Sequence, residues 1–115
     1  MNMSRKKELA DQYKQREIEG GVYAIRCEPS GKRMLDMTTD LAGARNRLQF
    51  SISTGLCPHH LLKEDWQAHG AEAFLFEVVE PLLKKEEESP KEYRESLSAL
   101  LEMVRQGVAE EEQYR

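Results

Sequence analysis

A group of cysteine and histidine residues lies in the middle of the sequence. Cys57 is followed closely by His59 and His60, and His69 comes a short segment later. Thiolate and imidazole are common zinc ligands, so this group is a candidate zinc site. No second Cys/His pair at a fixed spacing completes a tetrahedral set. We therefore favour capping of a helix start, and placement at the surface, for these side chains.

Other catalytic signatures are missing from the sequence. There is no glycine-rich dinucleotide loop, no Walker loop and no Ser/His/Asp order of the kind found in acyl-transfer enzymes. The two cysteines, Cys27 and Cys57, are too few for a disulfide framework or a four-cysteine zinc site. Cys27 stands in a run of strand-forming residues, and we expect it to be a small core residue.

Charge is divided unevenly along the chain. Residues 1–60 hold 10 Lys+Arg against 7 Asp+Glu, whereas residues 61–115 hold 7 against 14. Such a division can turn a basic face toward phosphate while the whole molecule stays acidic. Alternatively, the charged residues simply lie on the solvent-exposed faces of helices. The net charge of −4 excludes a nucleic-acid binder that relies on bulk positive charge.

Length and hydropathy indicate one domain. The 115 residues leave no room for a second core. No apolar run approaches the roughly 20 residues of a membrane span, and the first residues lack the apolar core of a signal peptide. We expect a cytoplasmic protein that does not bind membranes.

Local patterns predict the elements that must position any site. Residues 1–20 are predicted to form an N-terminal helix or arm, residues 21–107 the domain, and residues 108–115 a flexible tail. Within the domain, strands over 22–27 and 32–37 are joined by a Pro/Gly turn as a β-hairpin. The third strand is predicted over 73–79, followed by a surface loop that includes Pro81.

Helices fill the remaining segments. Asp40 or Thr39 is a suitable N-cap for a helix that ends near Gly55, and Leu62 and Trp66 form an i,i+4 pair in a short second helix. Ser89 begins a capping box with proline at the first helical position. The predicted class is α+β, in the order α-β-β-α-α-β-α, with a small three-stranded, mainly antiparallel sheet flanked by helices.

This order of elements, with the residues it carries, resembles the GIY-YIG nuclease superfamily over about four fifths of the chain. No single piece is specific, and the ordered series carries the resemblance. The matching pieces are Gly21-Val22-Tyr23, Gly31-Lys32-Arg33, Met34-Leu35-Asp36, Thr39-Asp40-Leu41, the run Gly55 to His59, His69-Gly70 and the strand Phe74 to Glu80.

The resemblance implies metal-dependent hydrolysis of a phosphodiester. In that family a tyrosine helps to activate water, an arginine stabilises phosphate charge, and a glutamate on a helix holds one divalent cation. Tyr23 matches the tyrosine of the first triplet, and Glu102 matches the glutamate. Arg45 is the nearest candidate for the arginine.

The sequence departs from the family pattern at several of these positions. Met34 replaces a tyrosine and cannot transfer a proton, and Asp36 stands where glycine is expected. An ungapped count places Ala44, rather than Arg45, at the position of the catalytic arginine. One residue rotates a helical side chain by about 100°, so Arg45 is a poor substitute for that arginine. Leu48 likewise stands where the family has a histidine.

These departures favour a catalytically degenerate GIY-YIG-like domain that acts as a nucleic-acid-binding or regulatory module. DNA or RNA would be bound at modest affinity, and no cofactor is expected. The alternatives are an active endonuclease that uses Mg²⁺ held by Glu102, and a protein-interaction module of the kind fused to bacterial transcriptional regulators. The residues predicted to contact nucleic acid are Arg26, Lys32, Arg33, Arg45 and Arg47.

Overall fold

A three-stranded antiparallel sheet forms the centre of the molecule. The structure, a computed structural model, describes residues 19–115, and the helix predicted within residues 1–20 falls almost wholly outside them. Strand β1 (Gly20–Cys27) lies between β2 (Arg33–Thr38) and β3 (Phe74–Leu82). Both pairings are antiparallel, so the predicted hairpin and the α+β class are confirmed.

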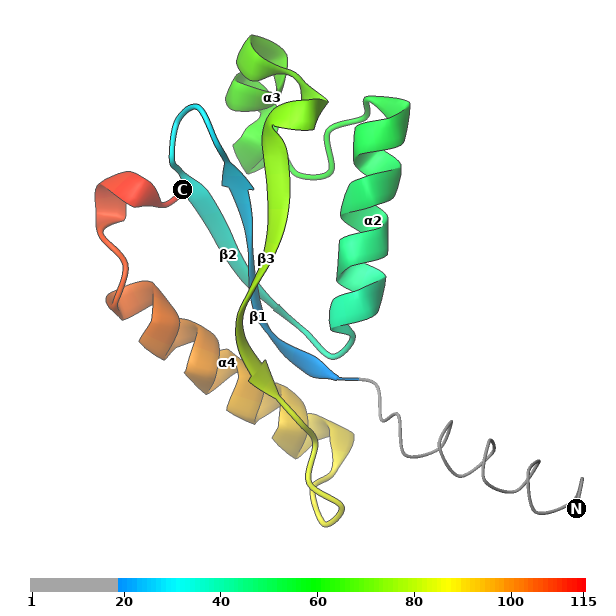
Figure 1. The fold of residues 1–115 in the computed structure, drawn as a ribbon. Coiled ribbons are helices and arrows are strands. Elements are labelled where there is room, and N and C mark those ends of the chain that lie inside the picture. The colour runs from blue at the N-terminus through cyan, green and yellow to red at the C-terminus, as the bar shows by residue number, and fades with distance from the viewer. Residues whose placement is uncertain (1–18) are drawn as a thin grey trace, which may run out of the picture.

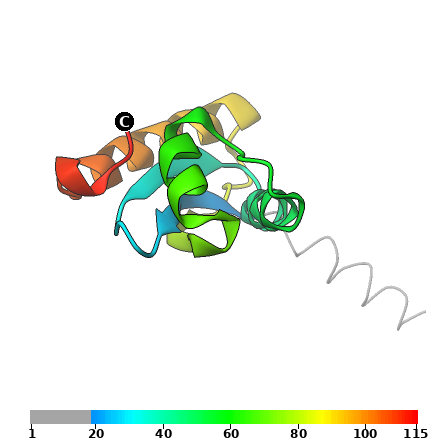
Figure 2. The same ribbon diagram turned by 90° about the horizontal axis from the view of Figure 1, so that it is seen from above.

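The helices cover both faces of this sheet. Helix α2 (Leu41–Thr54) lies on one side and α4 (Pro90–Gln106) on the other, as Figure 1 shows. The view from above in Figure 2 shows the same layers, with the short helix α3 (Lys63–His69) at the end of the sheet near the hairpin turn. In the part of the chain that the structure describes, no helix is both long and apolar enough to cross a bilayer.

The helix ends follow the predicted capping chemistry. The Asp40 side chain accepts a hydrogen bond from the backbone N–H of Gly43 at the start of α2. That helix ends at Gly55, whose φ of 76° lies in the left-handed region that favours glycine. At the start of α4, Ser89 and Glu92 form the predicted capping box.

Alternation along the strands divides the core into two layers. Tyr23, Ile25 and Cys27 of β1 pack toward α2 and α3, while Val22 and Ala24 pack toward α4. Cys27 is completely buried, as predicted. The layer under α2 and α3 also contains Met34, Leu41, Ala44, Leu48, Leu62, Trp66 and Phe74, and the layer under α4 contains Leu35 and Leu101.

Strand β3 is longer than predicted. It continues through Pro81 to Leu82, where the sequence pattern predicts a surface loop. Proline lacks a backbone donor, but β3 is an edge strand, where that loss is tolerated. A register shift between Val22 and Tyr23 leaves one extra residue on β3, which interrupts the alternation there.

The C-terminal residues follow the sheet instead of extending away from it. Residues 108–115, predicted to be a flexible tail, contain a 3-10 turn at Glu110–Glu112 and run back beside β2. The backbone N–H of Tyr114 donates to the Arg33 carbonyl at 2.9 Å. The Tyr114 hydroxyl donates to the Asp65 carboxylate at 2.6 Å.

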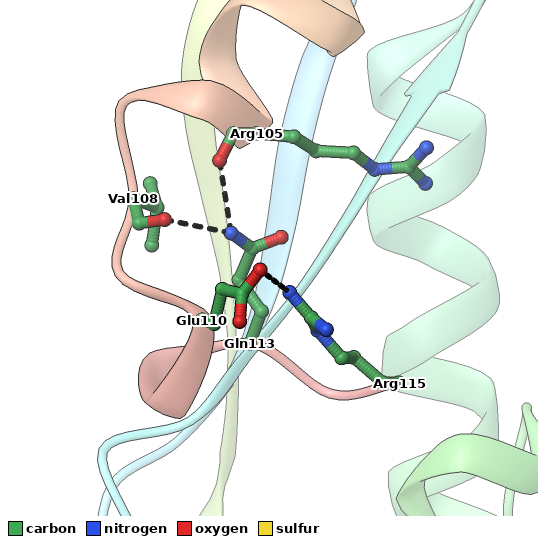
Figure 3. Close-up of polar contacts among 5 residues, drawn as sticks. All are labelled: Arg105, Val108, Glu110, Gln113 and Arg115. Atoms are coloured by element: carbon green, nitrogen blue, oxygen red, sulfur yellow. Dashed lines mark hydrogen bonds and ion pairs between the residues drawn. The ribbon is translucent and has the colours of Figure 1, made fainter.

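Side chains reinforce this return of the chain. Figure 3 shows the Gln113 amide donating to the carbonyl oxygens of Arg105 and Val108, each at 2.9 Å. Glu110 and Arg115 form an exposed ion pair at 2.7 Å. The tail is therefore attached both to α4 and to the sheet edge, through contacts that local sequence patterns do not predict.

Candidate functional site

A cavity of about 530 Å³ lies between the sheet and α2. Its floor is apolar because Ile25, Met34 and Leu48 belong to the core layer on that side. Its polar groups come from three segments: the paired strands β1 and β2, helix α2, and the loop before α3. They are the side chains of Tyr23, Asp36, Asn46, Arg47, Ser51 and His59.

Tyr23 is held as a protonated phenol. Its ring is 8% exposed and stacks on Phe76, with 5.0 Å between the ring centroids. Burial, and after it the Asp36 carboxylate, raise the pKa of Tyr23 to about 12, against the opposing effect of Arg47. The hydroxyl reaches Asp36 only at 3.5 Å, which is a weak hydrogen bond. At neutral pH this group can donate a hydrogen bond but cannot act as a base.

Asp36 is the direct neighbour of Tyr23 on the sheet. The two residues are cross-strand partners in the β1–β2 register. One carboxylate oxygen of Asp36 accepts the backbone N–H of Met37 at 2.8 Å, and the other faces Tyr23. A negative charge here repels a phosphate that approaches Tyr23.

Helix α2 presents two arginines in different directions. Ala44 and Leu48 are buried against the sheet, which fixes the rotation of the helix. Arg47 lines the cavity, whereas the guanidinium of Arg45 lies 5.4 Å from the centroid of the Phe76 ring. Side chains two positions apart on a helix differ by about 200° in direction around its axis, so Arg45 and Arg47 point to different places. Arg47, rather than the predicted Arg45, therefore shares the cavity with Tyr23.

Glu102 does not meet these residues. It is exposed on α4, beside a second cavity of about 510 Å³ that Leu35 and Arg105 also line; Met34 lines both this cavity and the α2 cavity. Leu35 belongs to the core layer on the α4 side of the sheet, whereas Tyr23 belongs to the layer on the α2 side. The structure thus does not bring Tyr23, Arg45 and Glu102 together as one constellation.

The residues present do not fit the magnesium site that the resemblance implies. Glu102 stands on α4, on the opposite side of the sheet from Tyr23 and Arg47, so these three side chains do not converge on one point. Among residues 19–115, no group of three or more His, Cys, Asp and Glu side chains is arranged to hold a metal ion.

The Cys/His segment has the capping role that we favoured. His59 Nδ1 accepts the backbone N–H of Leu61 at 3.1 Å, at the start of the 3-10 turn His60–Leu62. The Cys57 thiol donates to the His59 carbonyl at 3.1 Å. His59 also lines the cavity.

The other predicted basic residues lie away from the cavity. Arg26 alternates with Ile25 and Cys27, so it lies on the α4 side of the sheet, where it pairs with Glu77 at 2.6 Å. Its cross-strand partner Arg33 lies on that same side. Lys32 follows the hairpin turn, with its ammonium 5.9 Å from the Tyr114 ring centroid. Of the five residues predicted to contact nucleic acid, only Arg45 and Arg47 lie on helix α2.

Sequence reasoning missed one prominent side chain of the cavity. Phe50 lines it and is 65% exposed, although a large aromatic ring is usually covered. It stands three residues after Arg47, so the two side chains lie on neighbouring turns of α2. The exposed polar residue Asn46 was missed for the same reason: neither residue belongs to the apolar stripe of the helix.

Comparison with solved structures finds this fold in the catalytic domain of the intron endonuclease I-TevI, solved as a mutant. The TM-score is 0.62 at 13% sequence identity, over 84% of this chain and 92% of that chain. At this identity the likeness shows the fold alone, which is GIY-YIG-like. No protein-family model matches the chain. No curated protein matches it either.

Proposed function

We propose that this chain is a GIY-YIG-like domain that no longer hydrolyses phosphodiesters and binds nucleic acid along α2. The single observation that carries the proposal is the content of the α2 cavity. There Arg47 faces a protonated Tyr23 and the Asp36 carboxylate, while the candidate metal ligand Glu102 lies beyond the sheet. Such a site can hold a ligand, but it does not combine the tyrosine, arginine and glutamate on which the family's metal-assisted hydrolysis depends.

Binding would use the arginines of α2. Arg45 and Arg47 are both exposed, and no ion pair joins either of them to an acidic side chain among residues 19–115. Free guanidinium groups contact phosphate oxygens readily. The chain as a whole is acidic, so we expect modest affinity that decreases as the salt concentration rises.

A plasmid-nicking assay tests the loss of chemistry. Supercoiled plasmid is incubated with the full chain in Mg²⁺ or Mn²⁺, beside the variant Glu102→Ala. We expect no nicking by either protein. Nicking by the wild type that disappears in Glu102→Ala would contradict the proposal and support the active endonuclease.

A charge-reversal experiment tests the binding surface. Fluorescence anisotropy with DNA and RNA oligonucleotides compares Arg45→Glu/Arg47→Glu with Lys91→Glu/Arg94→Glu, which changes the net charge equally on exposed positions of α4. If the first pair contacts two phosphates, its loss lowers the slope of log K against log salt by about 1.4 for a single strand. We expect little change for the second pair.

Two outcomes would overturn this part of the proposal. Equal weakening by both double variants would show a nonspecific charge effect. No binding by the wild type in low salt would remove nucleic acid as the ligand and favour the protein-interaction module.

A further inference from the structure

Phe50 and Asp36 give the α2 cavity a composition that suits a nucleobase better than a phosphate. The cavity carries the Asp36 carboxylate beside Tyr23, its floor is apolar, and an aromatic ring stands exposed on α2. A phosphate would be repelled by Asp36, whereas a neutral base would bury its apolar surface on the floor. Arg47 lines the same cavity and could contact the phosphate of the same nucleotide.

From this arrangement we infer that the cavity takes one unpaired, amino-bearing base of a single-stranded nucleic acid, stacked on Phe50 and donating its amino group to Asp36. The inference rests on the proposed function, because it names the class of nucleic acid that the same site would take. Its ligand is a base with an exocyclic amine, as in cytosine or adenine.

The stacking partner is Phe50. Phe50 is 65% exposed and lines a cavity whose floor is apolar, so much of its side chain is available to a ligand. Aromatic side chains next to basic residues are the usual means of holding single strands. In a duplex, both faces of a base are covered by its neighbours, so this contact requires an unpaired nucleotide.

The hydrogen-bond acceptor is Asp36. An ionised carboxylate offers about four acceptor positions, and those used within the described residues are taken by the Met37 N–H at 2.8 Å and, weakly, by the Tyr23 hydroxyl at 3.5 Å. The spare positions can accept an N–H of cytosine or adenine. Thymine and uracil present a carbonyl oxygen at that edge, which a carboxylate repels.

Arg47 would contact the nucleic-acid backbone next to the bound base. Arg47 stands one helical turn before Phe50 and lines the same cavity. A nucleotide with its base on Phe50 would bring its phosphate within range of the Arg47 guanidinium. This geometry accounts for the presence of both a basic and an acidic residue in one cavity.

The test measures anisotropy of labelled oligo(dC) and oligo(dT), their RNA counterparts oligo(rC) and oligo(rU), and a duplex of equal length. The variants are Phe50→Ala and Phe50→Leu, with Met103→Ala as the matched control, because Met103 is 68% exposed on the other side of the molecule. We expect both Phe50 variants to bind oligo(dC) roughly fivefold or more weakly, and Met103→Ala to bind as the wild type does.

Base reading is tested separately with Asp36→Asn, which keeps the shape of the side chain. Wild type should prefer oligo(dC) to oligo(dT), and oligo(rC) to oligo(rU), roughly fivefold or more. An asparagine can both donate and accept, so Asp36→Asn should lose this preference while total affinity rises.

The outcomes separate this inference from the proposed function. Binding that is equally tight for duplex and single strand, and unchanged in Phe50→Ala, would overturn the inference and leave the proposed function standing. Equal affinity of the wild type for oligo(dC) and oligo(dT) would overturn the role of Asp36. Absence of binding to every probe would overturn both proposals.

Discussion

The pKa of Tyr23 makes a quantitative prediction about alkaline stability. In the unfolded chain this phenol ionises at its ordinary pKa of 10.0, whereas burial and the Asp36 charge raise the folded value to about 12. Because the folded pKa is the higher one, the stabilisation is fully present below pH 10 and is lost as the pH rises to about 12. Two pKa units correspond to about 3 kcal/mol of unfolding free energy.

The assay compares the wild type with Tyr23→Phe in urea unfolding over a series of alkaline pH values. The other ionisable groups titrate in both proteins, so the difference between them isolates Tyr23. We expect a constant difference below pH 10, and a further loss of about 3 kcal/mol in the wild type as the pH approaches 12. Parallel curves throughout would refute the burial argument.

A second variant separates the contribution of burial to the raised pKa of Tyr23 from that of the Asp36 charge. Asp36→Asn removes the charge that ranks after burial among the causes of the raised pKa of Tyr23. As the pH rises from 10 to 12, Asp36→Asn should therefore lose less unfolding free energy than the wild type, although it should still lose some. An unchanged loss would show that Asp36 does not act on the phenol. The same pKa leaves only about one Tyr23 in 10⁵ ionised at pH 7, which is why this residue is no base.

Two further predictions concern the core and the tail. Leu97→Ala, at a completely buried position of α4, should lower the free energy of unfolding by about 2–5 kcal/mol. Met103→Ala, at an exposed position of the same helix, should change that free energy by no more than about 0.5 kcal/mol. Similar losses for both variants would contradict the packing of α4. Tyr114→Phe removes the hydroxyl that holds the pKa of Asp65 below its usual range, so NMR titration should show that pKa rising, with about 1 kcal/mol of stability lost. An unmoved Asp65 pKa would show that the tail does not dock there.

Local chemistry made much of this fold predictable. The caps at Asp40 and Ser89 and the left-handed Gly55 depend on neighbours a few residues away, and each was found where the pattern indicated. The hairpin and the apolar stripes of α2 and α4 follow from strand and helix periodicity. These features identified the α+β class and the order of the described elements.

The end of β3 was predicted wrongly for a physical reason. Pro81 usually excludes a central strand, so the pattern predicted a loop there. Whether β3 lies at the edge of the sheet depends on the pairing of distant segments, which the local sequence does not contain.

Local periodicity predicted which side chains of α2 and α4 face a core, because it is a property of the backbone of one element. It did not determine which face of the sheet each helix covers. Tertiary structure alone decided that Arg47 shares a cavity with Tyr23, that Glu102 lies beyond the sheet, and that Tyr114 reaches Asp65. These contacts join segments far apart in the chain, and their geometry depends on how the connections place α2 and α4 on opposite faces.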